Sequence, residues 1–253
     1  TDIKEKYMRY NELTFQGRNA VLEAFRSGKT IDKLFILDGC QDGPIKSIVR
    51  EAKKTDAIIN YVDKERLDRL AGTGHHQGVV AIGAAYEYAE VEDILAAAKE
   101  KGEDPFIFIL DEIEDPHNLG AIIRTANLAG AHGVIIPKRR AVGLTATVAK
   151  TSAGAINYTP VAKVTNISQT IEELKKQGLW FVCADMGGET MYNLNLKGPI
   201  GLVIGNEGNG VSRLVKDKCD FIASIPMKGD IDSLNASVAA GVLAYEIVRQ
   251  RLN

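Results

Sequence analysis

The chain has 253 residues, of which 45% are hydrophobic and 25% charged, a composition typical of globular proteins and sufficient for one large domain or two modest ones. Its formal net charge of -2 and pI near 6.1 exclude the strong basic excess that would by itself indicate nucleic-acid binding. Residues 1–83 carry slightly more Lys and Arg than Asp and Glu, whereas residues 84–253 carry slightly fewer. This imbalance permits a polyanionic partner at the front of the chain but does not predict one.

The three cysteines, Cys40, Cys183 and Cys219, form no CxxC pair and show no Cys/His pattern with metal-ligand spacing. An odd number of isolated cysteines argues against a closed disulfide framework and favours a reducing compartment. The sequence also holds no apolar leader segment and no run of about 18 apolar residues that could cross a bilayer. We therefore expect a cytoplasmic protein without a membrane span.

Residues 1–12 are polar and unpatterned, which predicts a flexible leader. Helical spacing of Val21, Leu22 and Phe25 then predicts a helix near 17–26. The elements expected after it are a strand at 34–37, a helix near 44–54, a strand at 57–61, a helix near 63–71 and a strand at 78–82. This alternation predicts a small α/β domain over residues 13–83.

Residues 84–104 are expected to form a connector with a short Ala-rich helix, and residues 105–253 a second domain. The expected strands of this domain are 106–110, 133–136, 159–164, 179–184, 200–204 and 221–225, and its expected helices lie near 118–129, 167–177, 211–217 and 235–251. Apolar strands separated by helices predict an α/β fold with a mostly parallel sheet, covered on both faces. Because such sheets bind ligands beyond the carboxyl ends of their strands, the loops after Leu110, Ile204 and Ile225 are the candidate site.

Each of these three loops carries a polar motif. The first leads into a helix with Asn118 and Arg124, the second reads Gly205-Asn-Glu-Gly208, and the third contains Ile225-Pro-Met followed by Ser233-Leu-Asn-Ala-Ser-Val. Taken singly, each has an ordinary structural interpretation: a glycine turn, asparagine or serine N-caps, or an ion pair between Arg124 and the acidic residues before it. The glycine order is GxxGxG and not the dinucleotide-binding GxGxxG, which disfavours a dehydrogenase. The joint occurrence of three motifs at three strand ends favours one shared site.

These segments resemble the three signature motifs of the SpoU (TrmH) class of SPOUT RNA 2′-O-methyltransferases, and Lys150–Ala155 and the last helix are similar to the family as well. In front of them, Gly17–Ala24 and His76–Ala81 resemble the small ribosomal-protein-like substrate-binding domain of the rRNA branch. The whole chain is most similar to bacterial 23S rRNA guanosine 2′-O-methyltransferases. The resemblance implies a C-terminal SPOUT domain with a trefoil knot, an exception to the rule that chains do not thread loops. It also implies a homodimer and methyl transfer from S-adenosylmethionine to a ribose 2′-hydroxyl of RNA.

Two other functions stay open at this point. A tRNA ribose 2′-O-methyltransferase is the main rival within the enzyme class, although such relatives commonly lack a front domain. A noncatalytic RNA-binding protein of ribosome assembly, on the same fold, is the rival outside it. The sequence does not determine which nucleotide is modified, or distinguish a housekeeping role from antibiotic resistance.

The resemblance also implies roles for the site residues. The catalytic set is Arg124, Asn118, Glu207, Ser233 and Asn235, and the cofactor is expected to contact Gly205, Ile225 and Leu234, largely through the backbone. Arg124 matches the family's catalytic arginine. Since a guanidinium is ordinarily never deprotonated, we expect it to bind the target phosphate and stabilise a developing alkoxide and not to act as a simple general base.

The four histidines, His75, His76, His117 and His132, fit no zinc template, so no metal is expected. His76 lies in a Gly-flanked loop at the end of the front domain, and it is a candidate RNA contact together with Arg18 and Asn19.

A second candidate RNA contact is the basic run Lys138, Arg139 and Arg140, whose ordinary interpretation is a solvated turn and whose functional one is phosphate binding. The last helix, 235–251, is rich in small and apolar residues and leaves little polar face. We expect it to be buried in the core or against a second subunit.

Overall fold

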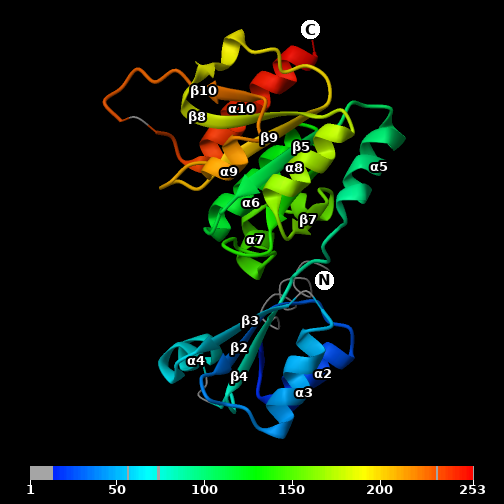
Figure 1. Cartoon of the computed structure of the whole chain (residues 1–253), viewed down its shortest axis with the longest axis vertical. Helices are drawn as coiled ribbons and strands as arrows, with labels where there is room; N and C mark the ends of the chain where they lie inside the picture. Colours follow the sequence, from blue (N-terminus) through cyan, green and yellow to red (C-terminus); the bar gives the residue numbers. More distant parts are fainter. Residues whose placement is uncertain (1–13, 56, 73–74, 232, 253) are drawn as a thin grey trace. The chain divides into compact units, whose positions relative to one another are not determined.

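The computed structural model describes residues 14–55, 57–72, 75–231 and 233–252. The chain divides into two compact units: unit 1 is Thr1–Glu87 with Gly143–Ala146, and unit 2 is Tyr88–Val142 with Thr147–Asn253 (Figure 1). The leader predicted at 1–12 lies outside the described residues. The division falls inside the segment predicted as a connector, and the helix expected there, α5 (Val91–Lys101), belongs to unit 2.

Unit 1 is built on a four-stranded sheet with the order β1-β4-β2-β3. Its elements in chain order are β1 (Thr14–Gln16), α2 (Arg18–Arg26), β2 (Ile31–Leu37), α3 (Gly43–Ala52), β3 (Ile58–Val62), α4 (Lys64–Ala71) and β4 (Val79–Gly83). Strand β2 pairs in parallel with β3 and antiparallel with β4, which also pairs antiparallel with β1. Asp42 and Asp63 cap α3 and α4 by accepting backbone N–H bonds of 3.2 Å and 2.8 Å, which fixes where these helices begin.

The core of unit 1 follows from the alternation of side chains along β2. Leu34 and Ile36 pack with Val21 of α2 on one face of the sheet, whereas Phe35 packs with Leu67 of α4 on the other. Helices α2 and α3 thus share one face and α4 covers the opposite one (Figure 1). Strand β3 is the outermost strand of the sheet on the side away from β1.

Unit 2 holds a six-stranded sheet with the order β10-β8-β9-β5-β6-β7, and every pairing within it is parallel. The strands are β5 (Phe106–Asp111), β6 (Gly133–Pro137), β7 (Val161–Val164), β8 (Trp180–Thr190), β9 (Ile200–Gly205) and β10 (Phe221–Ser224). The helices besides α5 are α6 (Pro116–Leu128), α7 (Ala146–Thr151), α8 (Ile167–Lys176), α9 (Arg213–Lys216) and α10 (Ala236–Arg251). The predicted α/β fold with a parallel sheet is confirmed.

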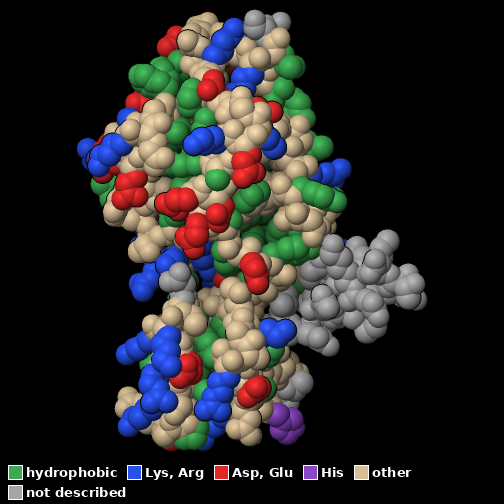
Figure 2. Space-filling view, turned by 90° about the vertical axis from the view of Figure 1, so that its right-hand side faces the viewer, with side chains coloured by type: hydrophobic (Ala, Val, Ile, Leu, Met, Phe, Trp, Pro, Cys, Tyr) green, Lys and Arg blue, Asp and Glu red, His purple; other side chains and the backbone are tan. Residues whose placement is uncertain are grey.

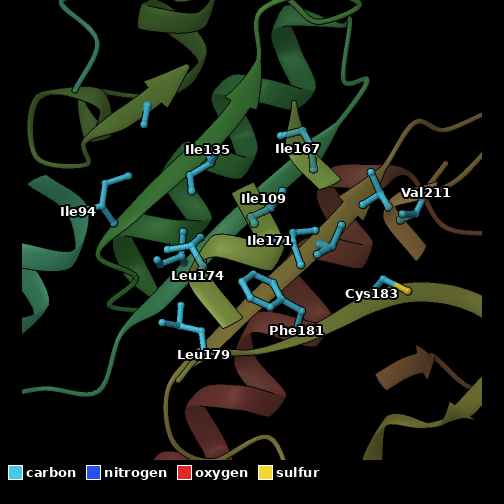
Figure 3. Close-up of a cluster of buried hydrophobic side chains, with 14 residues drawn as sticks. Ile94, Ile109, Ile135, Ile167, Ile171, Leu174, Leu179, Phe181, Cys183 and Val211 are labelled. Atoms are coloured by element: carbon cyan, nitrogen blue, oxygen red, sulfur yellow. The ribbon is translucent and has the colours of Figure 1, made fainter. Parts of the chain in front are cut away.

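Both faces of this sheet are covered. On one face, Ile94 of α5 and Ile171 of α8 pack against Ile109 and Phe181 of the strands, all fully buried (Figure 3). Phe106 belongs to the other face, where its ring lies 5.1 Å from the guanidinium carbon of Arg251 in α10. There α10 packs against α6 and β9. No helix among the described residues is long and apolar enough to span a membrane.

The structure departs from the expected elements at places where the sequence pattern is weak. Strand β8 continues to Thr190 and not to Ala184, because its second half pairs with β10 after a register shift. Two glycines in that half hide the strand pattern, and Gly188 is required there because a Cβ would lie 2.2 Å from the carbonyl oxygen of Ile222. Strand β1 and helix α7 are too short to produce a periodic pattern, and α9 covers only four residues.

Candidate active site

The first two motif loops start side by side because β5 and β9 are parallel neighbours, with Asp111 opposite Gly205. The Asn206 side chain donates from Nδ2 to the carbonyl oxygen of Glu112 at 3.1 Å. The carboxylate of Asp111 accepts from the backbone N–H of Ser212 at 2.8 Å. These two bonds fasten the loop after β5 to the loop after β9.

Three polar side chains, one from each motif, form a hydrogen-bonded network. Nδ2 of Asn118 and Nδ2 of Asn235 both donate to Oε1 of Glu207, the latter at 2.5 Å, and Nδ2 of Asn235 lies 3.1 Å from Oδ1 of Asn118. Oδ1 of Asn235 also caps α10, accepting from the N–H groups of Ser237 and Val238 at 2.9 Å and 3.3 Å. Asn235 therefore caps α10 and takes part in the network at the same time. The network brings together residues that lie 89 and 117 positions apart in the chain.

Arg124 is exposed on α6, the helix that also carries Asn118. Arg124 makes no ion pair with any described residue, so the ordinary interpretation, an ion pair with the acidic loop before α6, is not what the structure shows. Glu112 instead pairs with Arg140 at 3.0 Å, and Asp115 caps α6 by accepting from His117 N at 3.0 Å. The guanidinium of Arg124 is thus available for an anionic or oxygen-rich ligand.

A cavity of about 380 Å³ opens at the carboxyl ends of β9 and β10 and beside the middle of β8. Its lining is mainly small and apolar side chains together with the backbone of the glycine turn, including Ala184, Asp185, Met186, Ile204, Gly205, Asn206, Glu207, Ile225, Met227, Ser233, Leu234 and Ala236. All three residues predicted to contact a cofactor belong to this lining, and four of the five predicted catalytic ones, Asn118, Glu207, Ser233 and Asn235, belong to the lining or to the network beside it. The volume lies within the range of about 300–1,000 Å³ that is usual for small-molecule sites.

The glycine turn forms one wall of this cavity. It is closed by reciprocal backbone bonds between Asn206 and Gly210, of 3.1 Å and 2.8 Å. Gly205 is buried at its base, where a Cβ would lie 2.1 Å from the carbonyl carbon of Gly210 and 2.2 Å from the nitrogen of Val211. Gly205 is therefore required at this position, because two backbone segments approach each other closely there. As a result, peptide groups and not side chains face a ligand.

Asp185 lines the cavity and was not predicted from the sequence. Its carboxylate is hydrogen-bonded by the ammonium group of Lys216 and accepts from Gly187 N at 3.1 Å. The Lys216 contact holds the pKa of Asp185 below its usual value, so the carboxylate stays ionised at neutral pH. A signal was present, because Asp185 directly follows the strand predicted at 179–184, and parallel sheets place their ligand contacts beyond the ends of such strands.

The residues predicted to bind RNA in unit 1 lie in two different environments. Asn19 is exposed, and Arg18 pairs with Asp42 at 2.5 Å while donating from Nε to the carbonyl of Gln77 at 3.2 Å. His76 is only 6% exposed. Its Nδ1 accepts from Gly78 N and its Nε2 lies against Asp68, both at 2.9 Å, so both ring nitrogens are occupied in shaping the turn before β4. The geometry of His76 is that of a structural residue.

The basic run in unit 2 is likewise divided. Arg140 is bound to Glu112, as described above, whereas Arg139 is exposed and Lys138 is half-buried, with its backbone N–H donating to Val164. Among the described residues there is no group of three or more His, Cys, Asp or Glu side chains that could hold a metal ion.

The fold and the site define an α/β protein with a ligand-sized cavity, lined partly by backbone, beyond the carboxyl ends of parallel strands, and with an exposed arginine on the helix that carries Asn118. Residues 105–245 match the SpoU rRNA methylase family, and residues 16–89 match the substrate-binding domain of RNA 2′-O ribose methyltransferases. YacO of Bacillus subtilis, assigned to the TrmH family of tRNA/rRNA methyltransferases, is 53% identical over 236 residues, which are 93% of this chain and 94% of YacO. The chain belongs to the SpoU rRNA methylase family, as its motifs predicted.

Solved structures resemble the chain over different lengths. The SpoU methyltransferase AviRb from Streptomyces viridochromogenes, determined in complex with the cofactor AdoMet, has a TM-score of 0.61 at 24% identity and covers 97% of this chain and 98% of its own. The TrmH/SpoU tRNA modifying enzyme of A. aeolicus has a TM-score of 0.54 at 29% identity but covers only 59% of this chain and 77% of its own. The two-unit architecture is therefore shared with AviRb, and the tRNA enzyme matches little more than half of the chain.

Proposed function

We propose that this protein transfers a methyl group from S-adenosylmethionine to a ribose 2′-hydroxyl of RNA, with a guanosine of 23S rRNA as the favoured target. The observation that carries the proposal is the network of Asn118, Glu207 and Asn235, which joins three distant motifs at the rim of the cavity. Membership of the SpoU family supplies the reaction class.

The cavity fits S-adenosylmethionine, the cofactor with which AviRb was crystallised. Ile225 and Leu234 offer apolar surface, and the Gly205 turn offers peptide N–H and C=O groups that satisfy the polar edge of an adenine. The carboxylate of Asp185 and the hydroxyl of Ser233 are the polar side chains available for the rest of the cofactor. When bound, the cofactor supplies an electrophilic methyl group on a sulfonium, with its own leaving group.

The protein's tasks are then to orient the ribose and to stabilise charge on its 2′-oxygen. Arg124 donates hydrogen bonds to the target phosphate and to the developing alkoxide, and a phosphate oxygen or water takes the proton. Glu207, held by two amide groups, is fixed in position to accept from a ribose hydroxyl or orient the arginine. Asn118 and Asn235 act by holding Glu207.

The preference for rRNA rests on architecture. Unit 1 matches the substrate-binding domain named for RNA 2′-O ribose methyltransferases, and the tRNA modifying enzyme of A. aeolicus covers only 59% of this chain. A substrate that needs both units would account for the front domain. Of the RNA contacts predicted from the sequence, Asn19 and Arg139 are exposed, whereas Arg18 and Arg140 are held in ion pairs.

We further propose a homodimer formed through α6 and α10. These helices contact each other and carry large apolar side chains that solvent reaches: Leu128 is 64% exposed, Val238 49% and Tyr245 51%. A knot in the cofactor-binding segments and a cytoplasmic location complete the proposal; all three cysteines are free, as expected in a reducing compartment. Light scattering of the intact protein should give the mass of two chains, and a monomer with full activity would refute the dimer.

The test of the function is methyl transfer itself. Purified protein, radiolabelled S-adenosylmethionine and total RNA from a strain lacking the gene should yield label in 23S rRNA at a ribose 2′-position. Label in tRNA alone would establish the tRNA alternative and refute the rRNA preference. Cofactor binding without label in any RNA, ribosomal particles included, would favour the noncatalytic alternative.

A further inference from the structure

Unit 1 contains a second cavity, of about 410 Å³, that none of the motifs identifies. It lies between α3 and the edge strand β3 and will be called the α3–β3 groove. Lys46, Arg50 and Lys53 line it from the helix side, Tyr61 lines it from the strand, and Ile45 and Val49 provide apolar surface between them.

The three cations of the groove form one stripe. Lys46, Arg50 and Lys53 follow the spacing i, i+4, i+7, which places them on a single side of α3 and its C-cap, next to the apolar residues Ile45 and Val49. All three are exposed. Figure 2 shows Lys and Arg side chains gathered on the face of unit 1 that carries α2 and α3.

These charges have little compensation. The groove lining contains no Asp or Glu, and Lys46 and Lys53 make no ion pair with any described residue. Glu51 is the nearest acidic neighbour on α3, but its carboxylate is held by Lys54 at 2.9 Å and lies 3.9 Å from Nε of Arg50. The hydrogen bond from Lys54 also lowers the pKa of Glu51. A stripe of cations with so little compensation attracts a polyanion.

Tyr61 adds a feature that a merely solvated basic helix would lack. It is 56% exposed on β3, the outermost strand of its sheet, so its ring is accessible beside the cations. Cations that follow a backbone together with an exposed aromatic ring form the usual arrangement for single-stranded nucleic acid, in which phosphates meet the charges and a base stacks on the ring.

We propose that the α3–β3 groove binds a single-stranded segment of the RNA substrate, with its phosphates along Lys46, Arg50 and Lys53 and an unpaired base stacked on Tyr61. The inference rests on the proposed function, since it takes RNA as the substrate. It assigns RNA contacts to residues other than Arg18, Asn19 and His76.

The test compares two sets of charges on unit 1. In the groove variant, Lys46, Arg50 and Lys53 are all changed to Gln. In the matched control, Lys64, Arg66 and Arg69 of α4, which are equally exposed but lie over the other face of the sheet, are changed to Gln. Both variants remove three positive surface charges, so the net charge of the protein is the same in each.

Binding of a fluorescein-labelled oligouridine to the full chain is measured by anisotropy over a series of salt concentrations. For single strands each neutralised phosphate contributes about 0.7 to the slope of log K against log salt, so the groove variant should lower that slope by about 2 and the control should leave it nearly unchanged. Tyr61→Ala should weaken binding roughly 5- to 150-fold, the range of base–aromatic stacking, and Tyr61→Phe should restore it. Circular dichroism and S-adenosylmethionine binding confirm that each variant is folded.

The possible outcomes distinguish failure of the groove from failure of the methyltransferase proposal. Equal RNA binding by the groove variant, the control and the wild type would overturn the groove and leave the methyltransferase proposal intact. Preference for a duplex of the same length, with no effect of Tyr61→Ala, would also overturn it. Wild-type protein that binds S-adenosylmethionine but no RNA would refute both proposals, and protein that binds RNA through the groove but no cofactor would refute only the methyltransferase.

Discussion

The two units use polar side chains in opposite ways. In unit 2, Asn118, Glu207 and Asn235 hydrogen-bond to one another, so each is fixed in one geometry before any ligand arrives. In unit 1, Lys46 and Lys53 face solvent without partners among the described residues. Methyl transfer requires atoms placed within a fraction of an ångström, whereas holding a flexible polymer requires charge density more than fixed geometry. The difference suits the first unit to capture of RNA and the second to chemistry.

Arg124 combines the two behaviours, because it lies in the catalytic unit but is exposed like the groove cations. If it stabilises the developing alkoxide, Arg124→Ala should reduce the methylation rate by about 10²- to 10³-fold, the usual cost of removing one such donor. S-adenosylmethionine affinity, measured by calorimetry, should stay near that of the wild type. Undiminished turnover in this variant would remove Arg124 from the catalytic set.

The preorganisation of unit 2 depends on the glycine turn, and Gly205→Ala tests it. The added Cβ would lie 2.1 Å from Gly210, so the backbone wall of the cavity must move, at a cost of about 1–3 kcal/mol. If that cost falls on cofactor binding, S-adenosylmethionine affinity should fall roughly 5- to 150-fold. Gly208→Ala is the matched control, since its Cβ would meet nothing closer than 3.4 Å. Equal affinities for the two variants would show that the turn does not form the cofactor wall.

A smaller effect is expected from the network itself. Asn118 is 5% exposed, and Asn118→Ala removes one of the two amide donors to Glu207, which should lower the free energy of unfolding by about 1–3 kcal/mol. Urea denaturation provides the measurement, with Asn127→Ala on the same helix as a control at a half-buried position. Identical unfolding curves for the two variants would mean that the network does not hold the motifs together.

The smallest expected effect is a pH dependence of unit 2. The side chain of His132 is buried, its Nδ1 accepts from Phe106 N at 3.0 Å, and burial lowers its pKa below the usual 6.5 despite the contact with Glu103. The unfolded chain therefore binds a proton here more readily than the folded chain, so stability is complete above pH 6.5 and declines as the pH falls below it. Urea midpoints at pH 7.5 and about pH 5.5 should differ more for the wild type than for His132→Gln. A larger pH dependence in the variant would reverse the assigned sign.

Much of this structure could be predicted because the strongest patterns in the sequence are also its most buried elements. The buried strands β5 and β9 and their loops follow from uninterrupted apolar runs that end in polar motifs, and the rule for parallel sheets places them together. One predicted feature depended on partners that a sequence does not display. His76 is a candidate RNA contact from its place in a Gly-flanked loop, but Asp68 and Gly78 occupy its ring nitrogens.

The α3–β3 groove could not be predicted either, because it depends on which elements pack together. Its cations come from a helix and its aromatic ring from the following strand, and each alone is an ordinary surface residue. Only the parallel pairing of β2 with β3, which places β3 at the edge of the sheet, brings Tyr61 beside α3. Asp185 escaped prediction for a related reason, because the glycines after it conceal the continuation of β8.

The loops after β9 and β10 form one cofactor site, and the network of Asn118, Glu207 and Asn235 joins them to the first motif. Hydrogen–deuterium exchange of the intact protein with and without S-adenosylmethionine tests it most directly. The cofactor should slow exchange at 204–211 and 223–227, around the cavity, and leave unit 1 unchanged at 31–52. Protection confined to unit 1, or no protection at saturating cofactor, would contradict it.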